Sequence, residues 1–291
     1  MQILHTAVTA VSYTHLNVLV MTATPIPRTL ALILYGDLRS SVIDELPPGR
    51  KPVKTYAVGE SMRKRVYAFL EKNVRSGMQA YIICPLVEET EKSDLENAVS
   101  LCERLRVIFP DFEIGLIHGR MKAKEKDAIM SDFVEGHINV LVSTTVIEVG
   151  VNVPNSNMMI IENAERFGLS QLHQLRGRVG RGSEQAHCIM IAHGNSEITK
   201  KRMETMCASC DGFYIAEQDL KLRGPGDFFG TRQHGLPELK IANLFEDADM
   251  LSLAQNAAAD LLKADPGLSS EEHFALKNMV ADIISEKTVM N

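Results

Sequence analysis

The sequence contains no tryptophan, few aromatic residues and few cysteines, and these shortages exclude several classes of protein. Aromatic residues make up 5% of its 291 residues, and the five cysteines are an odd number without the spacing of a disulfide framework. No apolar run reaches the ~18 residues that a membrane-spanning helix needs, and the N-terminus lacks a signal-peptide pattern. We therefore expect an intracellular protein from a reducing compartment.

Two motifs that bind nucleotides and metals are also absent. No glycine is followed by lysine, so there is no phosphate-binding P-loop. Asp44-Glu45-Leu46-Pro47 superficially resembles a magnesium-binding acidic box, but it precedes a proline-rich linker instead of ending a buried strand, and we reject it. Cys207-Ala-Ser-Cys210 is a lone pair of cysteines, which we interpret as small buried or half-buried residues without zinc. We predict no metal ligands.

The remaining composition is that of an ordered protein with an uneven charge. Apolar residues make up 45% and charged residues 23%, which predicts a sizeable core and about two domains. Residues 243–291 contain nine acidic and three basic residues and carry the whole net charge of −6, because the preceding 242 residues contain 28 of each sign. Basic clusters remain in that neutral part, so overall acidity does not exclude a nucleic-acid partner.

Strand-like and helix-like segments alternate along most of the chain. After an expected strand at 17–21 and a linker at 46–52, the pattern predicts strands at 53–58, 79–84, 113–117, 137–142, 158–161 and 186–191. The expected helices cover 61–75, 93–109, 122–135 and a segment from about residue 170. Repeated strand–helix units predict an α/β fold, a parallel sheet with helices on both faces. Ligands bind at the carboxyl ends of such strands, where we expect all of the polar motifs to lie.

The two ends of the chain do not continue this alternation of strands and helices. Residues 1–16 show no usable periodicity and stay unassigned, with a cloning or sequence-boundary remnant as one interpretation. Residues 196–208 are expected to be helical, residues 211–235 are dense in glycine and mixed charge, and two helices over 244–264 and 270–284 are expected to end the chain.

The most informative stretch, Gln171 to Gly182, reads Gln-Leu-His-Gln-Leu-Arg-Gly-Arg-Val-Gly-Arg-Gly. Glycines separate Arg176, Arg178 and Arg181, and a glycine inside a helix costs about 1 kcal/mol relative to alanine. We therefore expect a tight loop that points all three guanidinium groups outward, where they can make bidentate contacts to phosphate. For three arginines alone, a solvated basic loop is an equally good interpretation.

Other polar residues follow expected strands. Ser143 to Pro154 supplies hydroxyls and backbone amides that are suited to phosphate oxygens, with hydroxyls that satisfy a turn as the alternative. His118 and the pair Thr22 and Thr24 end two further strands, and the same ambiguity applies to them.

Together these motifs resemble superfamily 2 helicases and, within them, the RecG family of bacterial branched-DNA helicases. Thr22-Ala-Thr-Pro resembles helicase motif III, His118-Gly-Arg-Met121 the motif IV region, Ser143 to Pro154 motif V, and Gln171 to Gly182 motif VI. Arg223 to Gly235 resembles the translocation motif that follows motif VI in this family. The transcription-repair coupling factor shares such a motif, but the amino-acid sequence of the motif in this chain is more similar to that of the RecG family.

The resemblance implies a domain organisation, ligands and a location. Residues 17–50 would be the tail of a first RecA-like lobe with its linker, 51–195 the second RecA-like lobe, and 196–291 the translocation motif and C-terminal helices. ATP and Mg²⁺ would be held mainly by a first lobe whose P-loop and acidic box this chain lacks. The partners would be branched double-stranded DNA, such as forks and Holliday junctions, and the missing lobe and wedge domain of the same protein. The implied location is the bacterial cytoplasm.

The resemblance also implies roles for individual residues. Arg178 and Arg181 would be arginine fingers that reach the γ-phosphate of ATP. The other implied residues are Gln174 and Gly150 for the nucleotide, His118, Thr144 and Thr145 for DNA, Arg202, Arg223 and Gln233 for translocation, and Thr22 and Thr24 for coupling between the lobes. One departure from the family is Gly-Val-Asn152 in place of Gly-Val-Asp, because asparagine keeps an acceptor but loses the charge. The missing P-loop leaves a non-enzymatic DNA-binding fragment as the alternative function.

Overall fold

The computed structural model of the chain describes residue 43 and residues 50–85, 91–144, 153–194, 196–229 and 248–289. The strand expected at 17–21 lies outside these residues. So do the predicted site residues Thr22, Thr24, Thr145, Gly150 and Gln233, together with the departure at Asn152.

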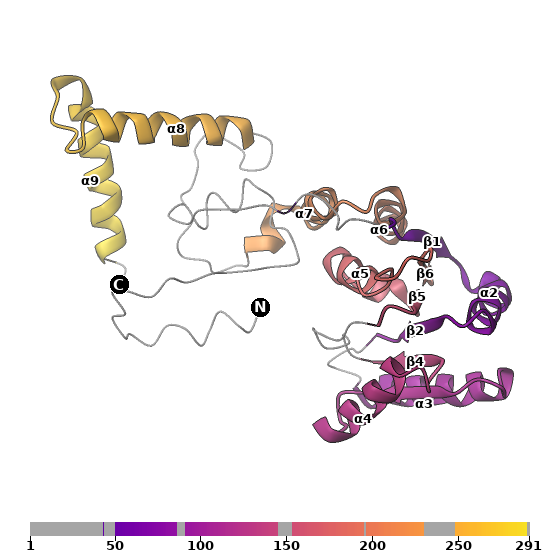
Figure 1. The fold of residues 1–291 in the computed structure, drawn as a ribbon. Coiled ribbons are helices and arrows are strands. Elements are labelled where there is room, and N and C mark those ends of the chain that lie inside the picture. Colours follow the sequence, from indigo (N-terminus) through magenta and orange to yellow (C-terminus); the bar gives the residue numbers. More distant parts are fainter. Residues whose placement is uncertain are drawn as a thin grey trace.

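Six parallel strands of the described residues form one sheet in the order β1-β6-β5-β2-β4-β3 (Figure 1). They are β1 (Lys54–Val58), β2 (Gln79–Ile83), β3 (Ile114–Ile117), β4 (Val140–Ser143), β5 (Ser156–Ile161) and β6 (His187–Ile191). Every residue of the central strands β2, β4 and β5 is buried, as expected for a parallel sheet with both faces covered. The predicted α/β class is confirmed.

Helices cover both faces of this sheet, because successive strand side chains point to opposite sides. On one face, α2 (Arg63–Arg75) and α3 (Glu91–Ile108) pack against alternate strand residues such as Ile82 and Ile160. On the other, α4 (Ala123–Val134) and α5 (Leu169–Arg176) pack against Tyr81 and Met159. Helices α6 (Glu197–Ala208) and α7 (Gly212–Phe229) add Met203, Met206 and Ile215 to that second core, next to α5 (Figure 1).

The predicted strands and helices agree with the structure apart from their ends. Strand β4 begins at Val140, three residues later than predicted, because the amides of His137 and Ile138 still bond to the carbonyl of Asp132 at the end of α4. Strand β5 begins two residues earlier than predicted, at Ser156, where it already pairs with Gln79 of β2. In both cases the strand end is set by a neighbouring element and not by local apolar content.

Helix α7 is the one large element of the described residues that the sequence did not predict, because the glycines between 212 and 229 obscure its pattern. Its start is fixed by Asp211, whose carboxylate accepts a hydrogen bond from the amide of Phe213 at 2.9 Å. Burial of Ile215 and Leu220 then stabilises a helix that continues through Gly224-Pro225-Gly226. Tertiary packing here outweighs local propensity.

The chain ends in α8 (Ala248–Ala264), the short 3₁₀ helix η4 (Glu271–His273) and α9 (Phe274–Val289), close to the two predicted helices (Figure 1). In the turn between them, Asp265 accepts hydrogen bonds from the amides of Ser269 and Ser270 and contacts Nδ1 of His273 at 2.9 Å. The contact with His273 and these amides hold the pKa of Asp265 well below its usual range. Among the described helices, none combines the length and apolar content needed to cross a bilayer. The predicted division of the chain into domains stays a prediction.

Two neighbouring residues at the end of α4 test the core on the α5 side of the sheet. Phe133 is fully buried against Tyr81, with ring centroids 4.8 Å apart, whereas Val134 is 44% exposed. We expect Phe133→Ala to lower the free energy of unfolding by about 3–5 kcal/mol, because it leaves a cavity. Val134→Ala should change it by less than about 0.5 kcal/mol. Urea unfolding followed by circular dichroism measures both, and equal effects would contradict the described packing.

Candidate nucleotide and nucleic-acid site

The predicted arginine loop begins where α5 ends. Buried Leu169, Leu172 and Leu175 fix α5 against the sheet, so the position of the loop is set by packing. The loop then turns sharply, and Gly180 adopts φ = +76°, a left-handed conformation that favours glycine. The amide of Gly180 approaches the carbonyl of Ser156, the first residue of β5, at 3.4 Å. We call residues 177–182 the finger loop.

Two further segments contact the backbone of the finger loop and hold it in place. A side-chain carbon on Gly182 would lie 2.5 Å from the carbonyl oxygen of Pro154, so only glycine fits there. Arg50, which belongs to the predicted linker, donates from Nη2 to the carbonyls of Gly177 at 3.2 Å and Val179 at 3.5 Å. The predicted linker therefore contacts the finger loop directly.

None of the three arginines of the stretch has a salt bridge among the described residues, and the side chains of Arg178 and Arg181 also lack the hydrogen bonds that Arg176 makes. Arg178 is half-buried and Arg181 is exposed. Burial and the neighbouring charge of Arg181 lower the pKa of Arg178. Burial raises the pKa of nearby Tyr81 to about 12, against the opposing effect of the two arginine charges. Two adjacent guanidinium groups without a carboxylate can bind an anion such as a phosphate.

Arg176 does not belong to this outward-pointing group, and the prediction that all three arginines point outward was wrong. It is 3% exposed and donates to the carbonyls of Met206 at 2.9 Å and Ser209 at 2.8 Å. The reason is its position as the last residue of α5, where its side chain faces α6 and not solvent.

His118 and Thr144 lie together at the carboxyl edge of the sheet. Each follows its strand directly, and the amide of Thr144 donates to the carbonyl of Ile117 at 3.2 Å. Nδ1 of His118 and Oγ1 of Thr144 are both buried without a hydrogen-bond partner among the described residues. Buried polar atoms of this kind call for a partner, and a phosphate oxygen is one that suits them both.

The finger loop lies at the opposite, amino edge of the sheet, so the expectation that all polar motifs share the carboxyl edge was wrong. Its contacts are with Pro154 and Ser156, which precede or begin β5. A segment that directly follows a strand must lie at the carboxyl edge, but the finger loop follows a helix that runs back along the sheet. The structure therefore separates the predicted phosphate contacts of His118 and Thr144 from the predicted fingers.

The other predicted site residues have less defined surroundings. Gln174 is half-buried on α5, and Arg202 is half-buried on α6, with its Nε buried and unpaired among the described residues. Arg223 lies on α7, where only the backbone is described. The roles of all these residues stay predictions. Cys207 and Cys210 are exposed and not buried as expected, and no three His, Cys, Asp or Glu residues of the described segments gather to hold a metal.

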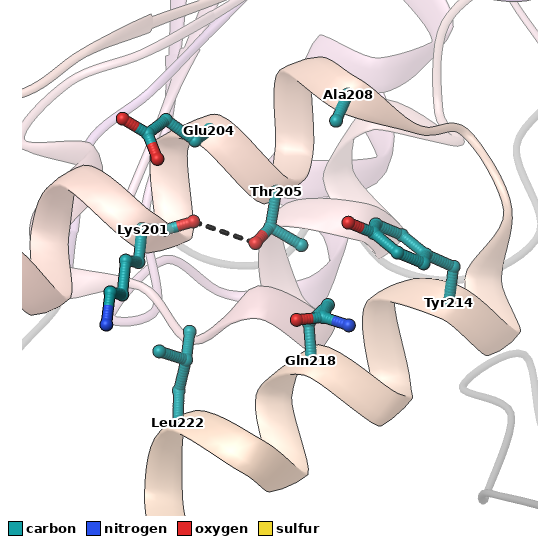
Figure 2. Close-up of a pocket in the computed structure, with 7 residues that line it drawn as sticks. All are labelled: Lys201, Glu204, Thr205, Ala208, Tyr214, Gln218 and Leu222. Carbon is teal, nitrogen blue, oxygen red and sulfur yellow. Dashed lines mark hydrogen bonds between the residues drawn. The ribbon is translucent and has the colours of Figure 1, made fainter.

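A groove of about 250 Å³ lies between α6 and α7 (Figure 2). A hydrogen bond of 2.7 Å from Thr205 Oγ1 to the carbonyl of Lys201 lies in its wall. The lining residues are Lys201, Glu204, Thr205, Ala208, Tyr214, Gln218 and Leu222. None of the predicted site residues is among them.

An ion-pair cluster that the sequence did not predict also lies at the carboxyl edge. Arg63 at the start of α2 makes a bidentate contact with Glu162 after β5, at 2.6 and 2.8 Å, and also bonds Glu60. Hydrogen bonds to Glu162 and then Glu60 raise the pKa of Arg63, while the bond from Arg63 lowers that of Glu60. The sequence feature that could have indicated this cluster is Glu162, a glutamate directly after a buried strand. The cluster ties α2 to β5.

Comparisons with known proteins agree with this geometry. Residues 62–183 match the family described as helicase conserved C-terminal domain, and residues 209–289 match ATP-dependent DNA helicase RecG, domain 3, C-terminal. The chain is 53% identical over 262 residues to the ATP-dependent DNA helicase RecG of Synechocystis, and 51% identical over 263 residues to that of Bacillus subtilis. Each match covers 90% of this chain. The chain belongs to the RecG family.

The match to the RecG family covers most of this chain but only part of its relatives. The chain spans 32% of the Synechocystis protein and 39% of the Bacillus subtilis protein, and corresponds to their C-terminal portion. A solved structure of RecG bound to a three-way DNA junction superimposes with a TM-score of 0.63 and 48% identity, over 79% of this chain and 30% of that chain.

A glycine substitution tests the close approach of the finger loop to Pro154. Gly182→Ala places a carbon against a backbone oxygen, and we expect it to lower the free energy of unfolding by about 1–3 kcal/mol. Gly59→Ala is the matched control, because nothing lies within 4 Å of the added carbon and φ is −86°. Thermal and urea unfolding measure both. A Gly182→Ala chain as stable as the control would contradict the described contact.

The surroundings of His173 predict a loss of stability in acid. Burial, and then the charge of Arg176, lower the pKa of His173 from 6.5 to about 4. As pH falls through this window the unfolded chain binds a proton that the folded chain does not, so stability decreases. His173→Gln keeps an acceptor for Arg176 but cannot titrate, and we expect it to lose less stability between about pH 7 and about pH 4.5 than the wild type.

The control for His173 is His137→Gln, because the His137 side chain is 68% exposed. Urea midpoints at the two pH values should fall as steeply in this control as in the wild type. A His173→Gln midpoint that falls equally steeply would show that His173 does not carry the effect.

Proposed function

We propose that this chain is the second motor lobe and translocation region of an ATP-dependent DNA helicase. In this proposal the whole protein remodels forks and Holliday junctions during DNA repair and recombination in the bacterial cytoplasm. The observation that carries the proposal is the finger loop, where Arg178 and Arg181 have no salt-bridge partner in the described residues. Supporting it, RecG-family relatives about half identical to this chain are ATP-dependent DNA helicases.

The finger loop supplies positive charge to a nucleotide held by another lobe. ATP, when bound there, supplies the γ-phosphoryl group that hydrolysis releases. Arg178 and Arg181 would hold its phosphate oxygens, and guanidinium groups remain charged at neutral pH. Comparable arginine fingers raise the rate of GTP hydrolysis by about 10³–10⁵. Gly180, between the two arginines, and Gly182, directly after Arg181, would hold both side chains in place by fixing the backbone of the loop. The Mg²⁺ ion would be held outside the described residues.

The carboxyl edge of the sheet is the proposed DNA-binding surface. Oγ1 of Thr144 and Nδ1 of His118 can take part in hydrogen bonds to backbone phosphates. Contacts of this type position a nucleic acid without reading its sequence, as a motor that moves along any sequence requires. A related RecG has been solved bound to a three-way DNA junction, which supports branched DNA as the substrate.

The test uses a chimera in which residues 50–291 replace the corresponding part of the Bacillus subtilis relative. We expect the chimera to hydrolyse ATP when forked DNA is added, and the isolated chain to show no turnover with or without that DNA. Arg181→Ala in the chimera should reduce turnover by about 10³-fold or more, because a finger stabilises transition-state charge. Its affinity for forked DNA should stay within about threefold of the wild type, because phosphates bound elsewhere dominate.

The matched control is Arg65→Ala, which removes an exposed arginine of α2 whose one side-chain hydrogen bond among the described residues is to Met62 Sδ at 4.0 Å. Its turnover should equal that of the unaltered chimera. Near-normal turnover by Arg181→Ala would overturn the finger assignment. Turnover by the isolated chain would require a nucleotide site within the chain itself, and DNA binding without any turnover by the chimera would favour the non-enzymatic alternative.

A further inference from the structure

Arg176 is the most completely bonded arginine near the finger loop. Its Nη1 donates to the carbonyls of Met206 at 2.9 Å and Ser209 at 2.8 Å, and approaches Oγ1 of Thr55 at 3.4 Å. Its Nη2 lies 2.9 Å from Nδ1 of His173. A planar guanidinium is suited to several simultaneous acceptors in fixed directions. Arg176 is thus tied to three elements of the fold: α5, α6 and β1.

The two carbonyls that Arg176 binds lie at the end of α6. The last carbonyls of a helix have no partner inside the helix, and a buried cation there also faces the negative end of the helix dipole. Arg176 therefore supplies the C-terminal cap of α6 from another helix. Arg202, which the family resemblance assigns to translocation, lies four residues before Met206, about one helical turn away.

On its own helix, Arg176 is the last residue before the finger loop. Gly177 follows Arg176 directly, and Arg178 is the next residue after Gly177. A shift of the finger loop therefore moves the backbone of Arg176, and its side chain is bonded to the end of α6. The side chain is 3% exposed, so water cannot replace a lost acceptor without the core opening.

We propose that Arg176 is a positioning residue that makes the finger loop and the end of α6 move as one unit. This proposal rests on the proposed function, because the movement it transmits is the response of Arg178 and Arg181 to the nucleotide. Arg176 itself touches neither nucleotide nor DNA. Its role is to convert a displacement of the finger loop into a displacement of α6 and of α7, which packs next to it.

The proposal predicts a loss of coupling between ATP turnover and movement. In the chimera, Arg176→Gln should retain ATP turnover within about threefold, while the number of base pairs unwound per ATP falls about tenfold. Arg176→Lys keeps the charge but reaches fewer acceptors, so its ratio should lie between those of the wild type and Arg176→Gln. Thr55→Val removes the 3.4 Å contact with Arg176 and the bond of Thr55 to the carbonyl of Val53 but leaves both bonds to α6, so as the control it should keep the wild-type number of base pairs unwound per ATP. Fork unwinding and phosphate release, measured in the same reaction, give the ratio.

A purely structural role predicts a different result, in which turnover and unwinding fall in the same proportion in both variants. That result would overturn the proposal. Circular dichroism will show whether Arg176→Gln is folded. If it is unfolded, the test rests on the number of base pairs that the Arg176→Lys chimera unwinds per ATP. A wild-type number in a folded Arg176→Lys chimera would also overturn the proposal.

An inactive chimera would count against the proposed function. The link that Arg176 makes between the finger loop and the end of α6 would then be tested in this chain by itself. Hydrogen exchange in Arg176→Lys should then increase both in residues 177–182 and in residues 205–210, because the two segments lose a shared tie. An increase confined to one of the two segments would overturn the link.

Discussion

Burial of both faces of the parallel sheet is the constraint on which the other features depend. Strands β2, β4 and β5 have no exposed residue, and two separate cores fill the space under the helices. Polar groups are therefore concentrated at the two edges, where segments leave the sheet. His118 and Thr144 lie at the carboxyl edge, and the finger loop lies at the amino edge. The strands set the distance between these edges, because a packed sheet does not deform easily.

The finger loop shows how the surroundings give one residue type two roles. Arg176 is buried and bonded to carbonyls at the end of α6, whereas Arg178 and Arg181 have no salt bridge among the described residues. The difference arises from the helix: α5 directs Arg176 toward α6, and the glycines that follow release the chain from the helix. A charge that already has its partners stabilises the fold, while charges without them can bind a phosphate.

Apolar runs and helical periodicity were sufficient to predict the strands, most helices and the α/β class, because burial governs both the pattern and the fold. Helix α7 was missed because Ile215 and Leu220 stabilise it from the core, which a glycine-rich sequence does not reveal. The pair of Arg63 and Glu162 joins residues 99 positions apart, and no local pattern records such a contact. Arg176 was misplaced because the spacing of arginines does not show which of them faces a neighbouring helix. The finger loop was assigned to the wrong edge because the rule about carboxyl ends applies to loops that follow strands.

These observations restrict how the two edges can be coupled. The sheet offers little movement, so a signal from the finger loop can pass through α5, which also packs against α7, or through elements that contact the loop from outside. Arg50 contacts it from the linker, the start of β5 holds Gly180, and Arg176 binds the end of α6. Of these three, only α6 continues into a segment with predicted translocation residues. Because Nη1 of Arg176 donates to two carbonyls at the end of α6, α6 cannot shift relative to the finger loop without breaking both hydrogen bonds. A force applied at Arg178 and Arg181 is therefore expected to move the finger loop and α6 together, because this movement keeps the buried hydrogen bonds of Arg176 intact.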